Sequence, residues 1–112
     1  MAKYKLTNKA VDDLAQIWNY TFEKWSERQA DKYYQMLIDN CEEIANSPDL
    51  GKNYSEVTQN LFGFNSGRHI IFYRRIEDKE IEITRILHEQ MDLKNRLKEK
   101  QLSSVASARR SL

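Results

Sequence analysis

The residues of this sequence best suited to act on a partner are four arginines and one histidine in its second half. They are Arg68, Arg74, Arg75, Arg85 and His88; His69 is the other histidine of the chain. Guanidinium groups bind carboxylates and phosphates through paired hydrogen bonds, and an imidazole can move protons near neutral pH. The set could therefore hold an amphipathic peptide or a phosphate group. Alternatively, the arginines only solubilise sheet edges and pair with Glu80 and Glu82.

His88 stands beside Glu89 at the junction of a predicted strand and a predicted helix, where an imidazole could shuttle protons. A histidine at such a junction more often caps the chain or packs against it. Two histidines without a further carboxylate or cysteine in register make a poor metal site. The sequence has no glycine-rich phosphate loop, nucleophile motif or paired-carboxylate signature, so neither a metal nor a cofactor is expected.

Three segments with a two-residue period predict the strands that carry these side chains. The strands are expected at 61–65, 68–76 and 80–87, with turns at 66–67 and 77–79 between them. The middle strand is strongly apolar and is therefore predicted to be central in the sheet.

Alternation assigns the side chains of these strands to the two faces of the sheet. In the strand 68–76, one face receives Arg68, Ile70, Phe72 and Arg74, and the other receives His69, Ile71, Tyr73 and Arg75. In the last strand, a common face is expected for Ile81, Ile83, Arg85 and Leu87. Helices should cover one face of the sheet. The other face, partly apolar and bearing arginines, should be open to a partner.

Two amphipathic helices precede these strands. The first is predicted to begin at Thr7 or Asn8, after a short strand at 4–7. The second is capped by Ser26 and ends at Ser47-Pro48. The apolar stripe of the first contains Val11, Leu14, Ala15, Trp18, Phe22 and Trp25; that of the second contains Ala30, Tyr33, Tyr34, Leu37, Ile38, Cys41, Ile44 and Ala45. Helices joined so closely form an antiparallel hairpin.

These elements predict an α+β fold with the order β-α-α-β-β-β. The helical hairpin packs on one face of a small antiparallel sheet, and a basic C-terminal helix is expected near 91–100. Residues 1–100 would form a single domain. Residues 101–112 are poor in large apolar groups and would form a disordered tail.

The composition suits a small cytoplasmic protein. The 112 residues suffice for a single core, and no apolar segment reaches the roughly 20 residues of a membrane span. No signal peptide is expected, and the single cysteine, Cys41, is predicted to be a buried thiol. Residues 1–60 carry 7 Lys and Arg against 10 Asp and Glu, whereas residues 61–112 carry 11 against 7. The second half therefore suits an acidic or anionic partner.

Three segments of the chain form a recognisable set. The first is Leu6-Thr7-Asn8-Lys9-Ala10 with Asp12, Leu14, Ile17 and Trp18. The second is Ser66-Gly67-Arg68-His69-Ile70-Ile71-Phe72-Tyr73-Arg74. The third is Ile81-Glu82-Ile83-Thr84-Arg85-Ile86-Leu87-His88 with Met91 and Asp92. Together they resemble the RelE/ParE superfamily of toxins from type II toxin–antitoxin systems, and its ParE branch in particular. The resemblance implies the same β-α-α-β-β-β fold.

The resemblance implies a toxin, and the superfamily contains two activities. RelE-like members cleave messenger RNA on the ribosome, using basic residues on the sheet and a late Tyr or His as general acid/base. ParE-like members are understood to poison DNA gyrase. The segment Leu87-His88-Glu89-Gln90-Met91-Asp92 has the ParE-like form, and no tyrosine follows Tyr73. These features favour a gyrase inhibitor that blocks replication without catalysis of its own.

Two alternatives remain open. One is a ribosome-dependent mRNA interferase, an endoribonuclease with His88 as acid/base and with Arg68, Arg74 and Arg85 on the phosphate. The other is an inactive antitoxin-binding module that serves as a co-repressor.

The resemblance also implies a cognate, ParD-like antitoxin as partner. Such antitoxins bind DNA themselves and wrap the toxin with an amphipathic, often acidic segment, so contact with DNA would be indirect. An arginine-bearing sheet in the basic half of the chain would suit such a segment. The partner-binding candidates are accordingly Arg68, Arg74, Arg75, Arg85 and His88. No membrane contact is expected.

Overall fold

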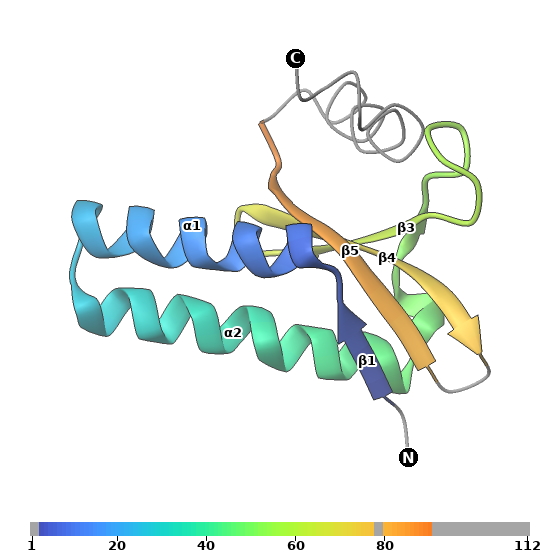
Figure 1. The fold of residues 1–112 in the computed structure, drawn as a ribbon, viewed down its shortest axis with the longest axis horizontal. Coiled ribbons are helices and arrows are strands. Elements are labelled where there is room, and N and C mark those ends of the chain that lie inside the picture. Colours follow the sequence, from blue (N-terminus) through green and yellow to red (C-terminus); the bar gives the residue numbers. More distant parts are fainter. Residues whose placement is uncertain (1–2, 78–79, 91–112) are drawn as a thin grey trace.

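A computed structural model describes residues 3–77 and 80–90. In chain order its elements are β1 (Lys3–Leu6), α1 (Asn8–Lys24), α2 (Glu27–Asn46), the 3-10 helix η1 (Pro48–Leu50), β2 (Lys52–Asn53), β3 (Phe62–Ser66), β4 (His69–Glu77) and β5 (Glu80–His88) (Figure 1). None of these helices has the length and hydropathy needed to cross a membrane. The predicted C-terminal helix at 91–100 and the predicted tail at 101–112 lie outside the described residues.

The strands form one sheet in the order β1-β5-β4-β3-β2. Neighbouring strands are antiparallel except at β1, which lies parallel to β5 with Lys3 opposite Glu80 and Leu6 opposite Ile83. Strands joined by a tight turn must be antiparallel. β1 and β5 are the first and last strands in the chain, so no turn joins them and they can pair in parallel. The predicted α+β architecture is confirmed; the parallel pairing and the short strand β2 are additions to it.

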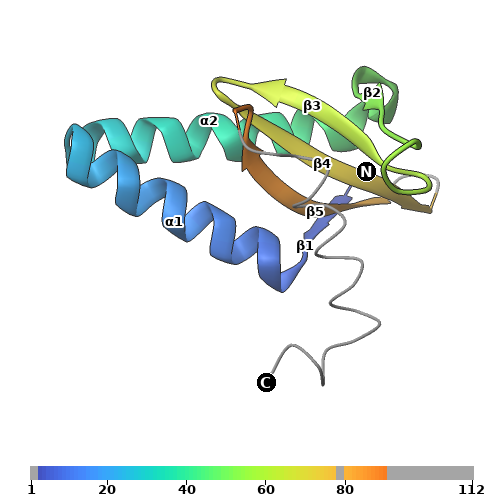
Figure 2. The same cartoon turned by 90° about the horizontal axis from the view of Figure 1, so that it is seen from above.

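The α1–α2 hairpin covers one face of the sheet, and its closed end, where α1 turns into α2, extends past the sheet (Figures 1 and 2). Each helix begins where its capping residue predicts. Thr7 Oγ1 accepts from the Ala10 N–H at 3.1 Å, which caps α1. Ser26 Oγ accepts from the Gln29 N–H at 3.1 Å, which caps α2. The main core between hairpin and sheet contains Ala10, Leu14, Ile17, Leu37, Cys41, Ile44, Ala45, Ile71, Tyr73, Ile81, Ile83 and Ile86.

The predicted apolar stripe of α1 is wrong in part, because the helix turns a different face to the sheet. Its buried residues are Ala10, Asp13, Leu14 and Ile17. Val11, Phe22 and Trp25 are instead 49%, 47% and 74% exposed. The last turns of α1 extend past the sheet and have nothing of it to cover (Figure 2). In addition, a charged residue, Asp13, occupies the buried face, which an apolar pattern cannot reveal.

A smaller apolar cluster lies on the other face of the sheet. Its buried members are Leu61, Ile70, Phe72 and Leu87. Tyr54 and Val57, from the connection between β2 and β3, pack on this cluster, and the Tyr54 and Phe72 rings meet edge to face at 5.2 Å. The apolar centre predicted to be open to a partner is therefore already covered. The prediction is wrong on this point, since the chain buries these side chains itself.

Tyr73 ties the connection after α2 to the sheet. Its hydroxyl donates to the Pro48 carbonyl at 2.6 Å and accepts from the Gly51 N–H at 2.9 Å. Its ring stacks on Phe62 with centroids 5.7 Å apart. A Cβ atom at Gly51 would collide with the Tyr73 hydroxyl, so this close approach requires glycine.

Cys41 is fully buried in the main core, as predicted from its place on the helix. Burial raises the pKa of its thiol to about 12. The group therefore stays protonated at neutral pH and acts as a small apolar side chain.

Candidate functional site

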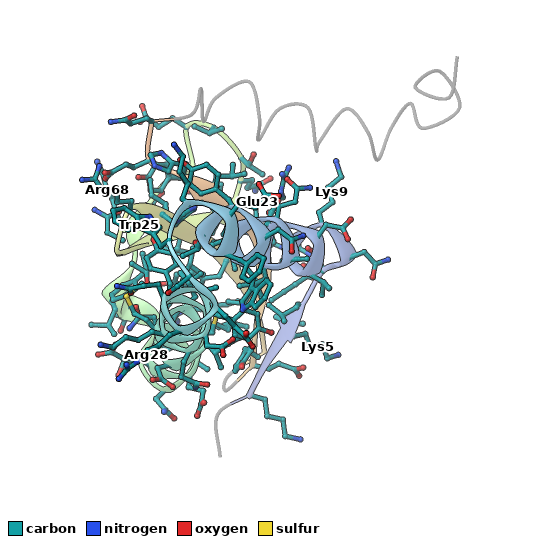
Figure 3. All side chains as sticks on the ribbon, turned by 90° about the vertical axis from the view of Figure 1, so that its left-hand side faces the viewer. Lys5, Lys9, Glu23, Trp25, Arg28 and Arg68 are labelled. Carbon is teal, nitrogen blue, oxygen red and sulfur yellow. The ribbon has the colours of Figure 1, made fainter. Side chains whose placement is uncertain are left out.

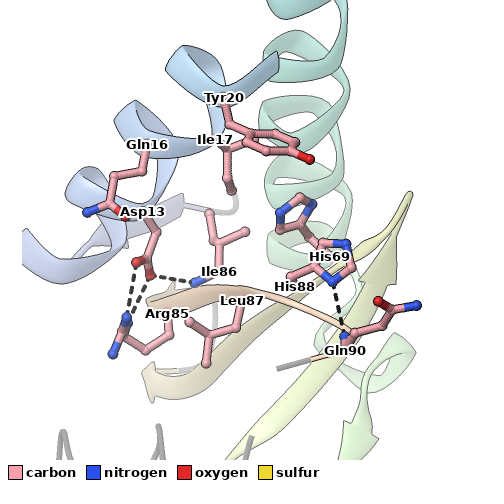
Figure 4. Close-up of a pocket in the computed structure, with 10 residues that line it drawn as sticks. All are labelled: Asp13, Gln16, Ile17, Tyr20, His69, Arg85, Ile86, Leu87, His88 and Gln90. Carbon is pink, nitrogen blue, oxygen red and sulfur yellow. Dashed lines mark hydrogen bonds and ion pairs between the residues drawn. The ribbon is translucent and has the colours of Figure 1, made fainter. Parts of the chain in front are cut away.

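Asp13 of α1 and Arg85 of β5 form a buried ion pair that joins the helix layer to the sheet (Figure 4). The Asp13 carboxylate accepts from Arg85 Nε at 2.8 Å and from Arg85 Nη2 at 3.1 Å. Its Oδ2 also accepts from the Ile86 backbone N–H at 2.9 Å. Both charged side chains are only 10% exposed. A bidentate pair with a further hydrogen bond satisfies charges that are otherwise costly to bury.

The pair stands where the edge of β5 loses its neighbouring strand. β1 follows β5 as far as Ile83, whose carbonyl accepts from the Thr7 N–H at 3.1 Å. The Thr7 hydroxyl then donates to the Thr84 carbonyl at 2.8 Å. Beyond this point the Asp13 carboxylate accepts the Ile86 hydrogen bond that another strand would otherwise take. A side chain from α1 thereby covers the strand edge.

A β-bulge at Thr84 sets the directions of the side chains near this pair. Phe72 lies opposite Arg85, whereas the next residue, Tyr73, lies opposite Ile83. Thr84 is therefore an extra residue in β5. Its hydroxyl donates to the Phe72 carbonyl at 3.2 Å, which fixes the bulge against β4.

The bulge overturns one prediction from the sequence, the common face for Ile81, Ile83, Arg85 and Leu87. In the structure Ile83 belongs to the main core on the helix side, whereas Leu87 belongs to the cluster on the other face. Strict alternation fails because one inserted residue exchanges the faces for every residue after it.

A groove of about 520 Å³ lies between α1 and the end of β5, beside the ion pair (Figure 4). Its lining combines polar and apolar side chains. These are Asp13, Gln16, Ile17, Tyr20, His69, Arg85, Ile86, Leu87, His88 and Gln90. Tyr20 is 62% exposed. The groove therefore offers a partner an accessible aromatic ring together with hydrogen-bonding groups.

His69 is held neutral in this groove. Its Nδ1 lies 2.7 Å from the Tyr33 hydroxyl, which itself accepts from the Arg68 backbone N–H at 3.0 Å. The Tyr33 hydroxyl can donate to Nδ1 of the neutral imidazole tautomer that carries its hydrogen on Nε2. Burial, with a smaller contribution from His88, lowers the pKa of His69 to about 4.

His88 lies directly opposite His69, and the two rings meet edge to face with centroids 5.2 Å apart. Its Nδ1 accepts from the Gln90 backbone N–H at 3.1 Å. The neighbouring Glu89 N–H donates to the Arg68 carbonyl at 2.9 Å. His88 thus holds the backbone at the end of β5, which is the capping role that the sequence also allows.

The four candidate arginines do not form one cluster. Ion pairs join Arg74 to Glu82, Arg75 to Asp49 and Arg85 to Asp13. Arg68 is exposed in the turn between β3 and β4, next to the histidine pair. Arg74 lies about 17 Å from His69 along β4, at about 3.3 Å per residue. One alternative from the sequence was that these arginines pair with Glu80 and Glu82. Arg74 does pair with Glu82, whereas Arg75 and Arg85 pair with carboxylates that were not predicted.

Two side chains that organise the site are absent from the set predicted by the sequence. Asp13 makes the ion pair, and Tyr33 orients His69. A signal exists for Asp13, because it lies one helical turn from both Ala10 and Ile17, and a charge on a buried face requires an opposite charge. Tyr33 gives no such signal, since it falls on an apolar stripe and resembles an ordinary packing residue.

Comparison with known proteins decides the family. Residues 4–93 match the model of the family described as "ParE toxin of type II toxin-antitoxin system, parDE". The chain belongs to the ParE toxin family. The predicted resemblance to the ParE branch is thereby confirmed, and the chain is a toxin of the type II toxin–antitoxin class.

Similar ParE toxins occur in several bacteria. The chain is 33% identical over 97 residues to Toxin ParE1 of Caulobacter vibrioides, covering 87% of this chain and 99% of that toxin. It is 29% identical over 96 residues to Toxin ParE1 of Mycobacterium tuberculosis, covering 86% and 98%. A solved structure titled "Chromosomal ParDE TA system from P. aeruginosa" has a TM-score of 0.67 at 21% identity, covering 79% of this chain and 96% of that one. This last likeness confirms the fold.

Replacing Asp13 by alanine is expected to lower the free energy of unfolding by about 3–5 kcal/mol, because Arg85 and the Ile86 N–H would stay buried without their acceptor. Urea unfolding followed by circular dichroism measures the loss. The matched control is Asp12→Ala, which removes an exposed carboxylate from the next position of α1 and should cost less than about 0.5 kcal/mol. Equal losses in both variants would contradict the structural role of Asp13.

The ParE fold is expected to lose stability in acid through His69. The unfolded chain protonates this imidazole near pH 6.5 and the folded chain only near pH 4, so the free energy of unfolding falls as pH drops through this window. The slope from this group reaches at most about 1.4 kcal/mol per pH unit. His69→Gln, whose amide oxygen can accept from Tyr33, should flatten the slope. His88→Gln keeps His69 and should retain most of it; an unchanged slope in His69→Gln would assign the acid loss to other groups.

Proposed function

We propose that this ParE toxin inhibits DNA gyrase by direct contact and that a cognate antitoxin neutralises it. Membership of a family of type II toxins supports the toxin role. One observation favours gyrase over RNA as the target: three of the four candidate arginines already face carboxylates. Gyrase works on DNA in the bacterial cytoplasm, so the toxin would act there.

RNA cleavage requires cations that are available to a phosphate next to a general acid or base. Arg85 gives both Nε and Nη2 to Asp13. Arg74 lies about 17 Å along β4 from the histidine pair. His88 accepts a backbone N–H on Nδ1. These groups do not converge on one phosphate, whereas inhibition of a protein target requires only a complementary surface.

The groove between α1 and β5 is the surface that suits the antitoxin best. Ile17 and Tyr20 supply apolar area there, and Arg68, exposed at the same end of the sheet, supplies a positive charge. An acidic amphipathic segment could place apolar side chains in the groove and carboxylates near Arg68. Arg74 and Arg75 are also exposed, but they lie toward the other end of β4 and on opposite faces of the sheet, so they would be separate contacts outside the groove. Arg85 would keep α1 in place beside the groove through its ion pair with Asp13.

Pulse labelling of DNA and protein synthesis, after induction in a bacterium without the antitoxin, tests the proposal. Thymidine incorporation should fall first while amino-acid incorporation continues, and the purified toxin should inhibit supercoiling by gyrase. His88→Ala should retain both effects, because His88 holds the strand end and does no chemistry. An early fall in amino-acid incorporation that His88→Ala abolishes would instead establish an mRNA interferase. No change in either label would favour the inactive antitoxin-binding module.

Reversing the charge of Arg68 should weaken the antitoxin complex. Arg68→Glu is expected to lower the affinity for the purified antitoxin about tenfold at low salt, and the difference should shrink as salt screens the charges. Isothermal titration calorimetry at two salt concentrations measures both effects. Lys32→Glu, an equal charge reversal on the exposed side of α2, is the control and should bind like wild type. Unchanged affinity in Arg68→Glu would remove this residue from the antitoxin surface.

A further inference from the structure

The α1–α2 hairpin carries a row of apolar and aromatic residues on its outer side, here called the hairpin ridge. Its members on α1 are Val11, Ala15, Phe22 and Trp25, all exposed, and the half-buried Trp18; Tyr34 of α2 stands beside them. The alternating spacing of four and three residues places the α1 members on one side of the helix. Figure 3 faces the closed end of the hairpin and shows Trp25 and Glu23 on the surface turned to the viewer. An exposed aromatic surface of this kind marks an interaction site.

A groove of about 380 Å³ crosses the ridge between the two helices. It is lined by Ala15, Trp18, Asn19, Asp31 and Tyr34. Trp18 Nε1 donates to Asp31 Oδ1 at 2.9 Å, and the Trp18 ring stacks on Phe22 with centroids 5.3 Å apart. The indole is therefore fixed before any partner arrives, which reduces the entropy lost on binding.

Aromatic walls beside a carboxylate form the chemistry that binds a cation. Aromatic rings such as those of Trp18 and Tyr34 attract positive charge through their π electrons, although Phe22 covers one face of Trp18, and Asp31 adds a full negative charge. Asp12 and Glu23, both exposed, stand next to ridge residues along α1, as does the exposed cation Lys24. Residues 8–46 carry eight Asp and Glu against four Lys and Arg, so the balance of charge on the hairpin is acidic. The ridge therefore attracts a Lys or Arg side chain of a partner, and it repels an acidic segment such as the one expected from the antitoxin.

We infer that the hairpin ridge is the surface with which this toxin holds DNA gyrase, with a Lys or Arg side chain of gyrase in the groove beside Asp31. The inference rests on the proposed function. An enzyme that works on DNA carries Lys and Arg around its DNA path, because phosphate charge dominates DNA binding. The toxin would thus present two surfaces of opposite charge, the ridge to its target and the Arg68 end of the sheet to its antitoxin.

The charge in the groove can be removed without disturbing the indole. Asp31→Asn keeps an oxygen that accepts from Trp18 Nε1. The toxin concentration that half-inhibits gyrase supercoiling should rise about threefold or more at low salt, and the increase should diminish at high salt. The control is Asp39→Asn, which neutralises another exposed α2 carboxylate; this one accepts from the Gln35 side chain at 2.9 Å. This control should inhibit gyrase like wild type.

The aromatic part of the ridge is tested by Trp25→Ser, which truncates its most exposed member. The half-inhibiting concentration should rise about tenfold or more, as expected when an exposed aromatic anchor of an interface is removed. The control is Leu50→Ser in η1, outside the ridge. Leu50 is 48% exposed, close to the exposure of Val11 and Phe22, and its replacement should have no effect on gyrase inhibition. Antitoxin affinity and urea unfolding should be the same for all four variants as for wild type.

The outcomes separate the inference from the proposed function. Equal gyrase inhibition by wild type, Asp31→Asn and Trp25→Ser would overturn the inference and leave the proposed function intact. Loss of antitoxin affinity in the ridge variants would assign the ridge to the antitoxin. If wild type is a dimer and the ridge variants are monomers that still inhibit gyrase, the ridge would be assigned to contact with a second copy of this chain. Either of these last two results would overturn the inference. Failure of wild type to inhibit gyrase would remove the proposed function and the inference together.

Discussion

The arrangement of this protein depends on the buried contact of Asp13 with Arg85 and the Ile86 N–H. The contact fixes the rotation of α1 about its own axis, because Asp13 can reach the edge of β5 from only one face of the helix. Ala10, Leu14 and Ile17 then face the sheet, and the hairpin ridge is left facing solvent. One ion pair therefore decides both how the core closes and which aromatic residues a partner can reach. The same pair uses Nε and Nη2 of Arg85 as donors to Asp13.

The charge balance along the sequence does not describe the charge on the folded surface, because ion pairs neutralise some of the arginines. The basic second half suggests a broad cationic face, but carboxylates from η1, α1 and β5 compensate three of its arginines. Within residues 3–77 and 80–90, Arg68 stands exposed at one end of the sheet, in contrast to the aromatic groove of the hairpin, which contains the carboxylate of Asp31. On the proposed function, the surfaces for the target and the antitoxin would be distinguished by the sign of their charge as much as by their shape.

Local signals account for what the sequence predicts correctly. The capping residues Thr7 and Ser26, the proline at 48 and the alternation in the strands each act within a few residues, so element order and fold class follow from them. The rotation of α1, the bulge at Thr84 and the covering of Phe72 by Tyr54 depend on residues far apart in the chain. No local pattern contains these contacts. For the same reason the candidate arginines could be listed by type, but their partners could not be assigned.

The pairing of β1 with β5 also affects when the protein can fold during its synthesis. Thr7 and Thr84, which bond across the β1–β5 junction, are 77 positions apart, so the strand made first finds its neighbour only when β5 has been made. A nascent chain still lacking β5 can form the hairpin, but nothing covers the apolar side of α1, and Asp13 has no arginine to meet. Contacts this distant close late and cooperatively. Fragments released early from the ribosome therefore lack the surfaces of the folded protein.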